Sequence, residues 1–249
     1  MAMNLVLDFG NTRAKVAKVE QGAIVAVEAF GYDQEAQIAE FIMQDNAYDG
    51  IILASVVDIE SQPLKNIIAS LPQKPLILSH QTPIPIENNY KSPETLGLDR
   101  LAAAVGAYNN YPNCNVLVID IGTAITYDLL SSSGIYLGGN ISPGINLRLK
   151  ALNAYTSKLP LVEANFDSAL FGKNTIEAIQ SGNYQGIVAE IDGIITKIMT
   201  IYPNLTVILT GGDANNFAKN LKNAIFVNFN IVIEGLNSIL EYNQNAKNN

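Results

Sequence analysis

The sequence contains the same short pattern twice, in LVLDFGNT at 5–12 and VLVIDIGT at 116–123, with the aspartates Asp8 and Asp120 lying 112 residues apart. In each copy an apolar run leads to an aspartate, and a glycine two residues later permits a tight reversal of the chain. A second extended segment and a glycine turn follow both copies. A repeat on this scale predicts two α/β domains of similar topology, because each copy starts one structural unit.

We place the predicted domains at residues 1–113 and 114–249. The segment YNNYPNCN at 108–115 is rich in asparagine and includes a proline, which is typical of a domain boundary. The apolar run GIILASVV at 50–57 predicts a central parallel strand, and LGLDRLAAAVGAY at 96–108 predicts a helix. Duplicated domains usually face each other across a cleft, so we expect a ligand between them.

Composition and charge exclude several classes of function. The net charge of −8 argues against a general basic surface for nucleic acid. Cys114 and His80 are the single residues of their types, so neither a disulfide within the chain nor a zinc or Ser-His site is expected. We interpret Cys114 as a buried or half-buried small apolar residue rather than a nucleophile, and His80 as structural or solvated. No basic segment precedes the first apolar run, and no run reaches the ~18–20 residues of a membrane helix. We therefore expect a cytoplasmic protein without nucleic-acid or membrane partners.

The first acidic turn has the residue types of a phosphate site. Asp8 ends an apolar run, Gly10 permits the reversal, and Asn11 and Thr12 add polar donors beside backbone N–H groups. Arg13 or Lys15 could add positive charge, and Asp8 could hold Mg²⁺ directly or through water. The alternative is an aspartate that only caps a turn, which one copy alone would favour. The second copy shifts the interpretation toward a nucleotide site.

Two glycine clusters lie in the second half, at 138–144 and at Gly211-Gly212. We interpret both as strand-to-helix junctions, where glycine lets a ligand approach the backbone. A plain tight turn is the alternative for each, and the strand expected before Gly211 favours nucleotide contact there. No Walker A loop and no GxGxxG fingerprint occurs, so neither a P-loop enzyme nor an ordinary Rossmann dehydrogenase is indicated.

Seven short motifs in this order resemble the type III pantothenate kinases, members of the acetate and sugar kinase, Hsp70 and actin superfamily. They are DFGNT at 8–12, GLDR at 97–100, DIGTAIT at 120–126, YLGGNISPGI at 136–145, ALNAYTSKLP at 151–160, GKNT at 172–175 and LTGGDA at 209–214. The motifs span nearly the whole chain. The resemblance implies an α/β fold of two duplicated RNase H-like, actin-like ATPase domains that face each other across a cleft.

The resemblance also implies an activity, which is ATP-dependent phosphorylation of pantothenate to 4′-phosphopantothenate, the first step toward coenzyme A. It implies Asp99 as the general base, Asp120 as the ligand of a monovalent cation (K⁺ or NH₄⁺), Mg²⁺ at Asp8, and a homodimer. The implied ATP-binding residues, including the two glycines above, are Asp8, Gly10, Asn11, Thr12, Lys15, Thr123, Gly211 and Gly212. The implied pantothenate-binding residues are Tyr90, Gly97, Leu98, Asp99, Arg100 and Thr175.

The chemistry of GLDR is reasonable without the resemblance. A carboxylate such as Asp99 can accept the proton of a primary hydroxyl, and Arg100 can bind a carboxylate with paired donors. A charge pair at a helix N-terminus is the alternative, and the other six motifs favour catalysis. Two further hypotheses remain: a related kinase for another small alcohol, and a non-catalytic regulator that keeps this fold. The acidic residues at 8, 99 and 120 argue against the regulator.

Overall fold

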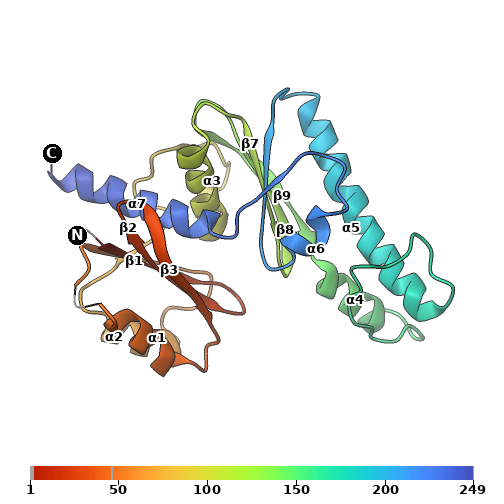
Figure 1. Ribbon diagram of the computed structural model, residues 1–249, viewed down its shortest axis with the longest axis horizontal. Coiled ribbons are helices and arrows are strands. Elements are labelled where there is room, and N and C mark those ends of the chain that lie inside the picture. The colour runs from red at the N-terminus through yellow and green to blue at the C-terminus, as the bar shows by residue number, and fades with distance from the viewer. Residues whose placement is uncertain (1–2, 46, 249) are drawn as a thin grey trace. The chain divides into compact units, whose positions relative to one another are not determined.

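The computed structural model describes residues 3–45 and 47–248 (Figure 1). Contacts divide the chain into two compact units, and each is described by itself. Unit 1 contains the chain up to residue 112, the short segment 134–136 and the chain from residue 230, and unit 2 contains residues 113–133 and 137–229.

Unit 1 is built on a five-stranded sheet with the order β3-β2-β1-β4-β5. Its strands are β1 (Met3–Phe9), β2 (Ala14–Glu20), β3 (Ala23–Phe30), β4 (Gly50–Ser55) and β5 (Leu76–Ile77). The first strand pairs antiparallel with β2 and parallel with β4. The apolar run predicted as a central parallel strand is β4, which is buried over nearly its whole length.

Unit 2 repeats this arrangement with strands in the order β11-β10-β7-β8-β9. They are β7 (Val116–Ile121), β8 (Ala124–Leu130), β9 (Ile135–Pro143), β10 (Thr206–Thr210) and β11 (Phe226–Val227). Again the first strand, β7, pairs antiparallel with the next strand and parallel with the fourth, β10. Counted along the chain, these two sets of five strands both have the order third, second, first, fourth, fifth. The predicted α/β class and the similar topology of the two halves are therefore confirmed.

The helices of unit 1 are α1 (Glu35–Met43), α2 (Gln62–Ser70), α3 (Leu98–Asn110) and α7 (Ile231–Asn248), with a short 3₁₀ helix at Pro93–Thr95. The apolar face of α1, formed by Ile38, Phe41 and Ile42, packs into the same core as β1 and β4. The short strand β6 (Glu87–Asn88) runs parallel to Ile135 and Tyr136, the first residues of β9, which belong to this unit.

The C-terminal helix α7 packs against α3. Their backbones approach closely because glycines lie at the crossing. A Cβ atom on Gly235 would come 1.8 Å from the carbonyl oxygen of Ala102, and one on Gly106 would come 2.2 Å from that of Ile231. The sequence places this closing helix in the expected domain 114–249, whereas its contacts are with unit 1. The two units are defined by contacts between residues and do not test where each domain of the fold begins and ends. The predicted boundary at 113/114 therefore stays a prediction.

The helices of unit 2 are α4 (Ile145–Ala154), α5 (Thr175–Met199) and α6 (Ala214–Ala218). Ile187, Ile191 and Ile195 of α5 are fully buried and lie in one core with residues of β7 and β8. One expectation about this unit is wrong. Gly138 and Gly139 do not lie at a strand-to-helix junction but inside β9, which continues to Pro143. The junction is at Gly144, the residue before α4.

Candidate active site

The first acidic turn joins β1 to β2. Asp8 is the penultimate residue of β1 and lies opposite Lys15 in the β2 register. The N–H of Gly10 donates to the carbonyl of Arg13 at 3.0 Å and so closes the turn. Asn11 and Thr12 are exposed at its tip. The turn therefore presents small polar side chains next to a half-buried carboxylate, as the sequence predicts.

Tyr32 holds this turn in place, and the sequence analysis did not single it out. Its hydroxyl donates to the carbonyl oxygen of Gly10, and its ring stacks on Phe9 with the centroids 6.4 Å apart. Burial, followed by the negative charge of Asp8, raises the pKa of Tyr32. The register of the β2–β3 hairpin indicates this position, because Phe30 pairs with Ala14 and residue 32 therefore lies beside the turn.

Asp99 is the second residue of α3, and its carboxylate is positioned by the backbone around it. Oδ1 accepts from the N–H of Arg100 at 2.8 Å. A Cβ atom on Gly97 would lie only 2.5 Å from the same oxygen, so residue 97 needs to be glycine for this placement. Leu98 begins the helix and is half-buried. The four residues of GLDR thus form one compact group around a half-buried carboxylate.

Arg100 is buried, with 7% of its surface exposed. Its Nη2 donates to the hydroxyl of Tyr136 at 3.1 Å, and Tyr136 is fully buried. The ring of Tyr90 packs edge-on against that of Tyr136, with centroids 6.0 Å apart. The structure therefore brings the predicted residues Tyr90 and Arg100 together through Tyr136. This tyrosine lies in a quoted motif but was not predicted as a site residue.

The second acidic turn, in unit 2, is built around Asp120. This residue lies in β7, opposite Thr210 of the parallel strand β10. Gly211 follows Thr210 with φ of +91°, a region that favours glycine. A Cβ atom there would come 2.5 Å from Asp120 Oδ1, and a Cβ on Gly122 would come 3.4 Å from it. The carboxylate of Asp120 therefore lies against two glycines.

Two other segments contact this turn through Gly144 and Asp213. The N–H of Gly144 donates to the carbonyl of Thr123 at 2.9 Å, and a Cβ on Gly144 would come 2.1 Å from the carbonyl oxygen of Gly122. The N–H of Asp213 donates to the carbonyl of Ile121 at 3.0 Å. The structure thus gathers the exposed Thr123 with Asp120 and the glycines before α6. Gly212, next to Gly211, is also exposed.

Asp213 follows these glycines and is half-buried. Burial raises the pKa of this carboxyl group, and a hydrogen bond of 3.2 Å from the Asn216 side chain opposes that shift. Thr175 is the exposed first residue of α5, and the Asn174 side chain caps this helix by accepting from the N–H of Glu177 at 3.0 Å.

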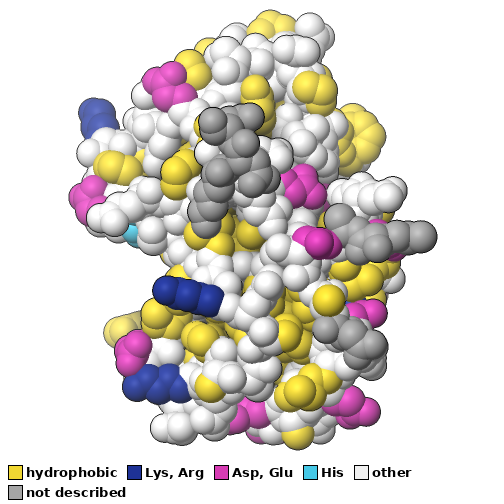
Figure 2. Space-filling model, turned by 90° about the vertical axis from the view of Figure 1, so that its left-hand side faces the viewer, with side chains coloured by type: hydrophobic (Ala, Val, Ile, Leu, Met, Phe, Trp, Pro, Cys, Tyr) yellow, Lys and Arg dark blue, Asp and Glu magenta, His cyan; other side chains and the backbone are white. Residues whose placement is uncertain are grey.

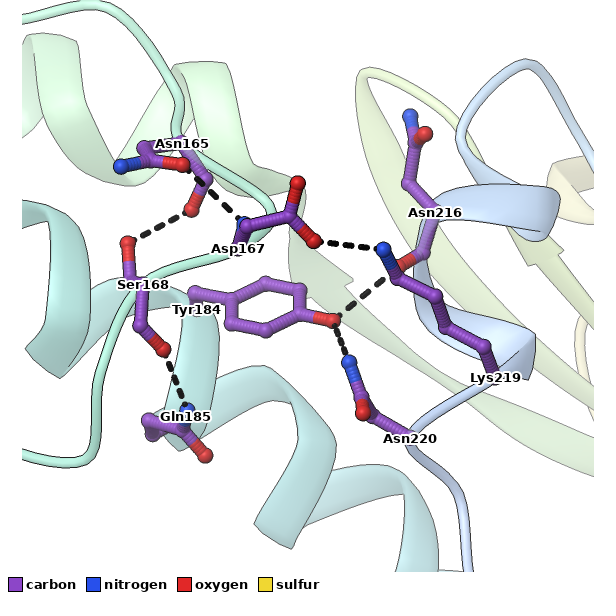
Figure 3. Close-up of polar contacts among 8 residues, drawn as sticks. All are labelled: Asn165, Asp167, Ser168, Tyr184, Gln185, Asn216, Lys219 and Asn220. Carbon is purple, nitrogen blue, oxygen red and sulfur yellow. Dashed lines mark hydrogen bonds and ion pairs between the residues drawn. The ribbon is translucent and has the colours of Figure 1, made fainter.

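Tyr184 of α5 anchors the helix that follows Gly211-Gly212 (Figure 3). Its hydroxyl donates to the carbonyl of Asn216 at 3.0 Å and accepts from the Asn220 side chain. Its ring lies 5.1 Å from that of Phe217. A pocket of about 620 Å³ lies beside this network, between residues 166–170, α5 and residues 220–222. No predicted site residue lines this pocket or the pocket of about 270 Å³ beside α7.

Within residues 3–45 and 47–248, no group of three or more His, Cys, Asp or Glu side chains could hold a metal ion. Lys and Arg side chains lie at separate points on the face drawn in Figure 2. None of the described helices combines the length and the apolar character needed to cross a membrane.

The fold is the actin-like ATPase fold, which solved structures of a dehydratase activator and a hexokinase share. The activator of 2-hydroxyisocaproyl-CoA dehydratase from Clostridium difficile, with bound ADPNP, has a TM-score of 0.57 at 13% identity and covers 99% of this chain and 98% of its own. The ROK hexokinase from Thermus thermophilus has a TM-score of 0.52 at 11% identity, with coverage of 97% and 99%. At such identities the likeness shows the fold alone, and the predicted actin-like ATPase fold is confirmed.

The sequence comparisons define the family. The family model for type III pantothenate kinase matches residues 4–197. A type III pantothenate kinase of Phocaeicola vulgatus is 43% identical over 97% of this chain and 99% of its own length. One from Bacteroides fragilis is 44% identical, with coverage of 97% and 98%. The chain belongs to the type III pantothenate kinase family.

Proposed function

We propose that this chain is an ATP-dependent kinase that phosphorylates pantothenate to 4′-phosphopantothenate, the first step of coenzyme A biosynthesis. The observation that carries the proposal is the match at more than 40% identity over nearly the full length of two type III pantothenate kinases. An actin-like ATPase fold with two acidic strand-to-turn segments supports ATP as the phosphoryl donor.

In this proposal Asp99 accepts the proton of the pantothenate hydroxyl. Its carboxylate is held by the Arg100 N–H and lies over Gly97, so its position is fixed before substrate binds. Tyr90 and Arg100 bind the substrate beside it, with Gly97 and Leu98. The packing of Tyr90 on Tyr136, which also accepts from Arg100, supports treating these residues as one substrate group.

The ATP phosphates would contact Gly10, Asn11 and Thr12, with Lys15 supplying charge. Phosphoryl transfer depends mainly on alignment and charge neutralisation, which a turn of N–H groups and hydroxyls beside a lysine can supply. On the other acidic turn, Thr123, Gly211 and Gly212 would contact the nucleotide. Their arrangement around Asp120 supports this assignment.

Two cations are part of the proposal. Mg²⁺ fits Asp8, because a magnesium ion bound to nucleotide phosphates usually needs only one or two protein carboxylates. A monovalent cation, K⁺ or NH₄⁺, fits Asp120, whose carboxylate lies among glycines and backbone carbonyls that offer hard oxygen ligands. These ions would neutralise phosphate charge when bound.

We also propose a cytoplasmic homodimer. Unit 2 exposes several large apolar side chains between the end of α4 and the first residues of α5, and such surfaces mark interaction sites. They are Tyr155, Leu161, Leu170, Phe171 and Ile176, each at least half exposed. Thr175, assigned to pantothenate, is the neighbour of Ile176, so a pantothenate contact from Thr175 could cross between subunits.

Product analysis tests the proposed reaction. The protein is incubated with ATP, Mg²⁺, K⁺ and pantothenate, and mass spectrometry looks for pantothenate carrying one phosphoryl group. A panel of other small alcohols is run in parallel. Preferred phosphorylation of another alcohol would indicate a related kinase. A folded protein that phosphorylates none of them would favour the regulatory alternative.

A further inference from the structure

Arg148, the fourth residue of α4, contacts several segments of unit 2. Its Nε donates to the carbonyl of Pro143 at 2.7 Å, and its Nη2 donates to the hydroxyl of Ser142 at 2.9 Å. The same Nη2 forms an ion pair with Glu190 Oε2 at 2.5 Å. The guanidinium therefore holds the last residues of β9 and a residue of α5 at once.

Glu190 is fixed by partners of its own. Its Oε1 accepts from the hydroxyl of Tyr127 at 2.9 Å, and Tyr127 is buried in β8. Burial opposes ionisation of Glu190, but hydrogen bonds from Arg148, Ser142 and Tyr127 outweigh it and lower the pKa of the carboxyl group. The pair is therefore charged at neutral pH.

The residues that Arg148 holds lead directly to the second acidic turn. Ser142 and Pro143 precede Gly144, whose N–H donates to the carbonyl of Thr123. Gly144 also packs so tightly on Gly122 that it has no room for a Cβ atom. A continuous series of contacts thus runs from α5 through Arg148 to the turn that follows Asp120.

We infer that Arg148 and Glu190 are positioning residues that hold residues 142–144 against the Gly122–Thr123 turn and so preorganise the nucleotide side of the site. The inference rests on the proposed function only in assigning that turn to ATP. A partly buried ion pair is weak evidence for stability, because desolvation offsets much of the attraction. Directed contacts to a backbone carbonyl and a hydroxyl beside the turn fit a positioning role instead.

Hydrogen exchange at a single amide tests the inference. In Glu190→Gln and Arg148→Gln, the amide of Gly144 should exchange roughly tenfold faster than in the wild type, because a charge-assisted hydrogen bond is lost. The dissociation constant for ADP should rise by a similar factor, while KM for pantothenate stays within about twofold. The matched control is Glu60→Gln, which removes the exposed Lys65–Glu60 ion pair in unit 1. This control should leave the exchange rate of the Gly144 amide, the dissociation constant for ADP and KM for pantothenate unchanged.

A lower melting temperature with unchanged Gly144 exchange and unchanged ADP affinity would overturn the inference and leave a purely structural pair. If the glutamine variants do not fold, the more conservative variant Arg148→Lys tests the inference instead. Lysine keeps the charge opposite Glu190 but lacks the paired geometry that also reaches Pro143. Faster Gly144 exchange in a folded Arg148→Lys protein would support positioning, and wild-type exchange would contradict it. If the wild type did not phosphorylate pantothenate, the proposed function would be wrong, but the exchange rate of the Gly144 amide would still test the inference.

Discussion

The carboxylate of Asp120 lies directly against Gly211, so closely that a Cβ atom at residue 211 would come 2.5 Å from Asp120 Oδ1. The positive φ of Gly211 and the pairing of β7 with β10 produce this contact. It connects the proposed cation ligand to the glycines assigned to the nucleotide. A substitution at Gly211 therefore meets both backbone strain and a lack of space, whereas one at Gly212 meets neither.

Gly211→Ala should lower the free energy of unfolding by about 1–3 kcal/mol, because alanine is strained at this φ and collides with Asp120. Activation by K⁺ should weaken in the same variant as the carboxylate is displaced. The neighbouring Gly212→Ala is the stability control, since nothing lies within 4 Å of a Cβ there. Chemical denaturation measures both variants. Equal stability of the two would show that neither the positive φ nor the close approach of Asp120 and the Ile121 carbonyl constrains residue 211.

Tyr32→Phe should raise KM for ATP severalfold and leave KM for pantothenate nearly unchanged. The substitution removes the hydroxyl that holds the Gly10 carbonyl, so the phosphate turn loses preorganisation. Tyr48→Phe is a matched control, because Tyr48 donates to the Ile42 carbonyl in the same unit. Each variant should lose ~0.5–1.5 kcal/mol of stability. If both variants raised KM for ATP equally, Tyr32 would have no special role in the turn.

Stability should fall at high pH partly through Tyr48. Burial, followed by the negative charge of Asp45, raises the pKa of Tyr48 to about 12 from a usual value of 10.0. The folded protein therefore keeps this proton at a pH where the unfolded chain loses it. The resulting stability is present below pH 10 and is lost as the pH rises toward 12. Urea unfolding across this range should show a shallower decline for Tyr48→Phe, and parallel curves would contradict the assignment.

Phe171→Asp should convert the proposed dimer to a monomer. Phe171 is 81% exposed, and a charge at the centre of an apolar interface is costly to bury. Light scattering after gel filtration measures the mass. The control Ile201→Asp alters another exposed apolar residue of unit 2, at 70% exposure, outside residues 155–176. Dimers in both variants would place the interface elsewhere, and a monomeric wild type would exclude the dimer.

The repeat of strand, aspartate and glycine predicted the two sheets because strand periodicity and turn chemistry are local properties. For the same reason, the positions of Asp8 and Asp120 near strand ends could be predicted. The contacts of Tyr136 and of the Arg148–Glu190 pair could not be predicted, because they depend on how separate elements pack. The packing of α7 on α3 is of this kind as well. For Tyr32, the hairpin register indicates a place beside the first turn but not the hydrogen bond to Gly10. Gly138 and Gly139 were misplaced because paired glycines usually interrupt a strand, and here β9 continues through them.

The role of Asp99 and the reaction itself are tested together by ADP release in a coupled assay, with and without pantothenate and K⁺. Folded wild type should release ADP only when pantothenate is present, and faster with K⁺. Asp99→Asn should reduce kcat by roughly 100- to 10,000-fold while retaining ADP binding and the melting temperature. The control Glu94→Gln changes an exposed acid just before α3 and should keep wild-type turnover. Pantothenate-independent ADP release by the wild type, or near wild-type turnover by Asp99→Asn, would contradict the account.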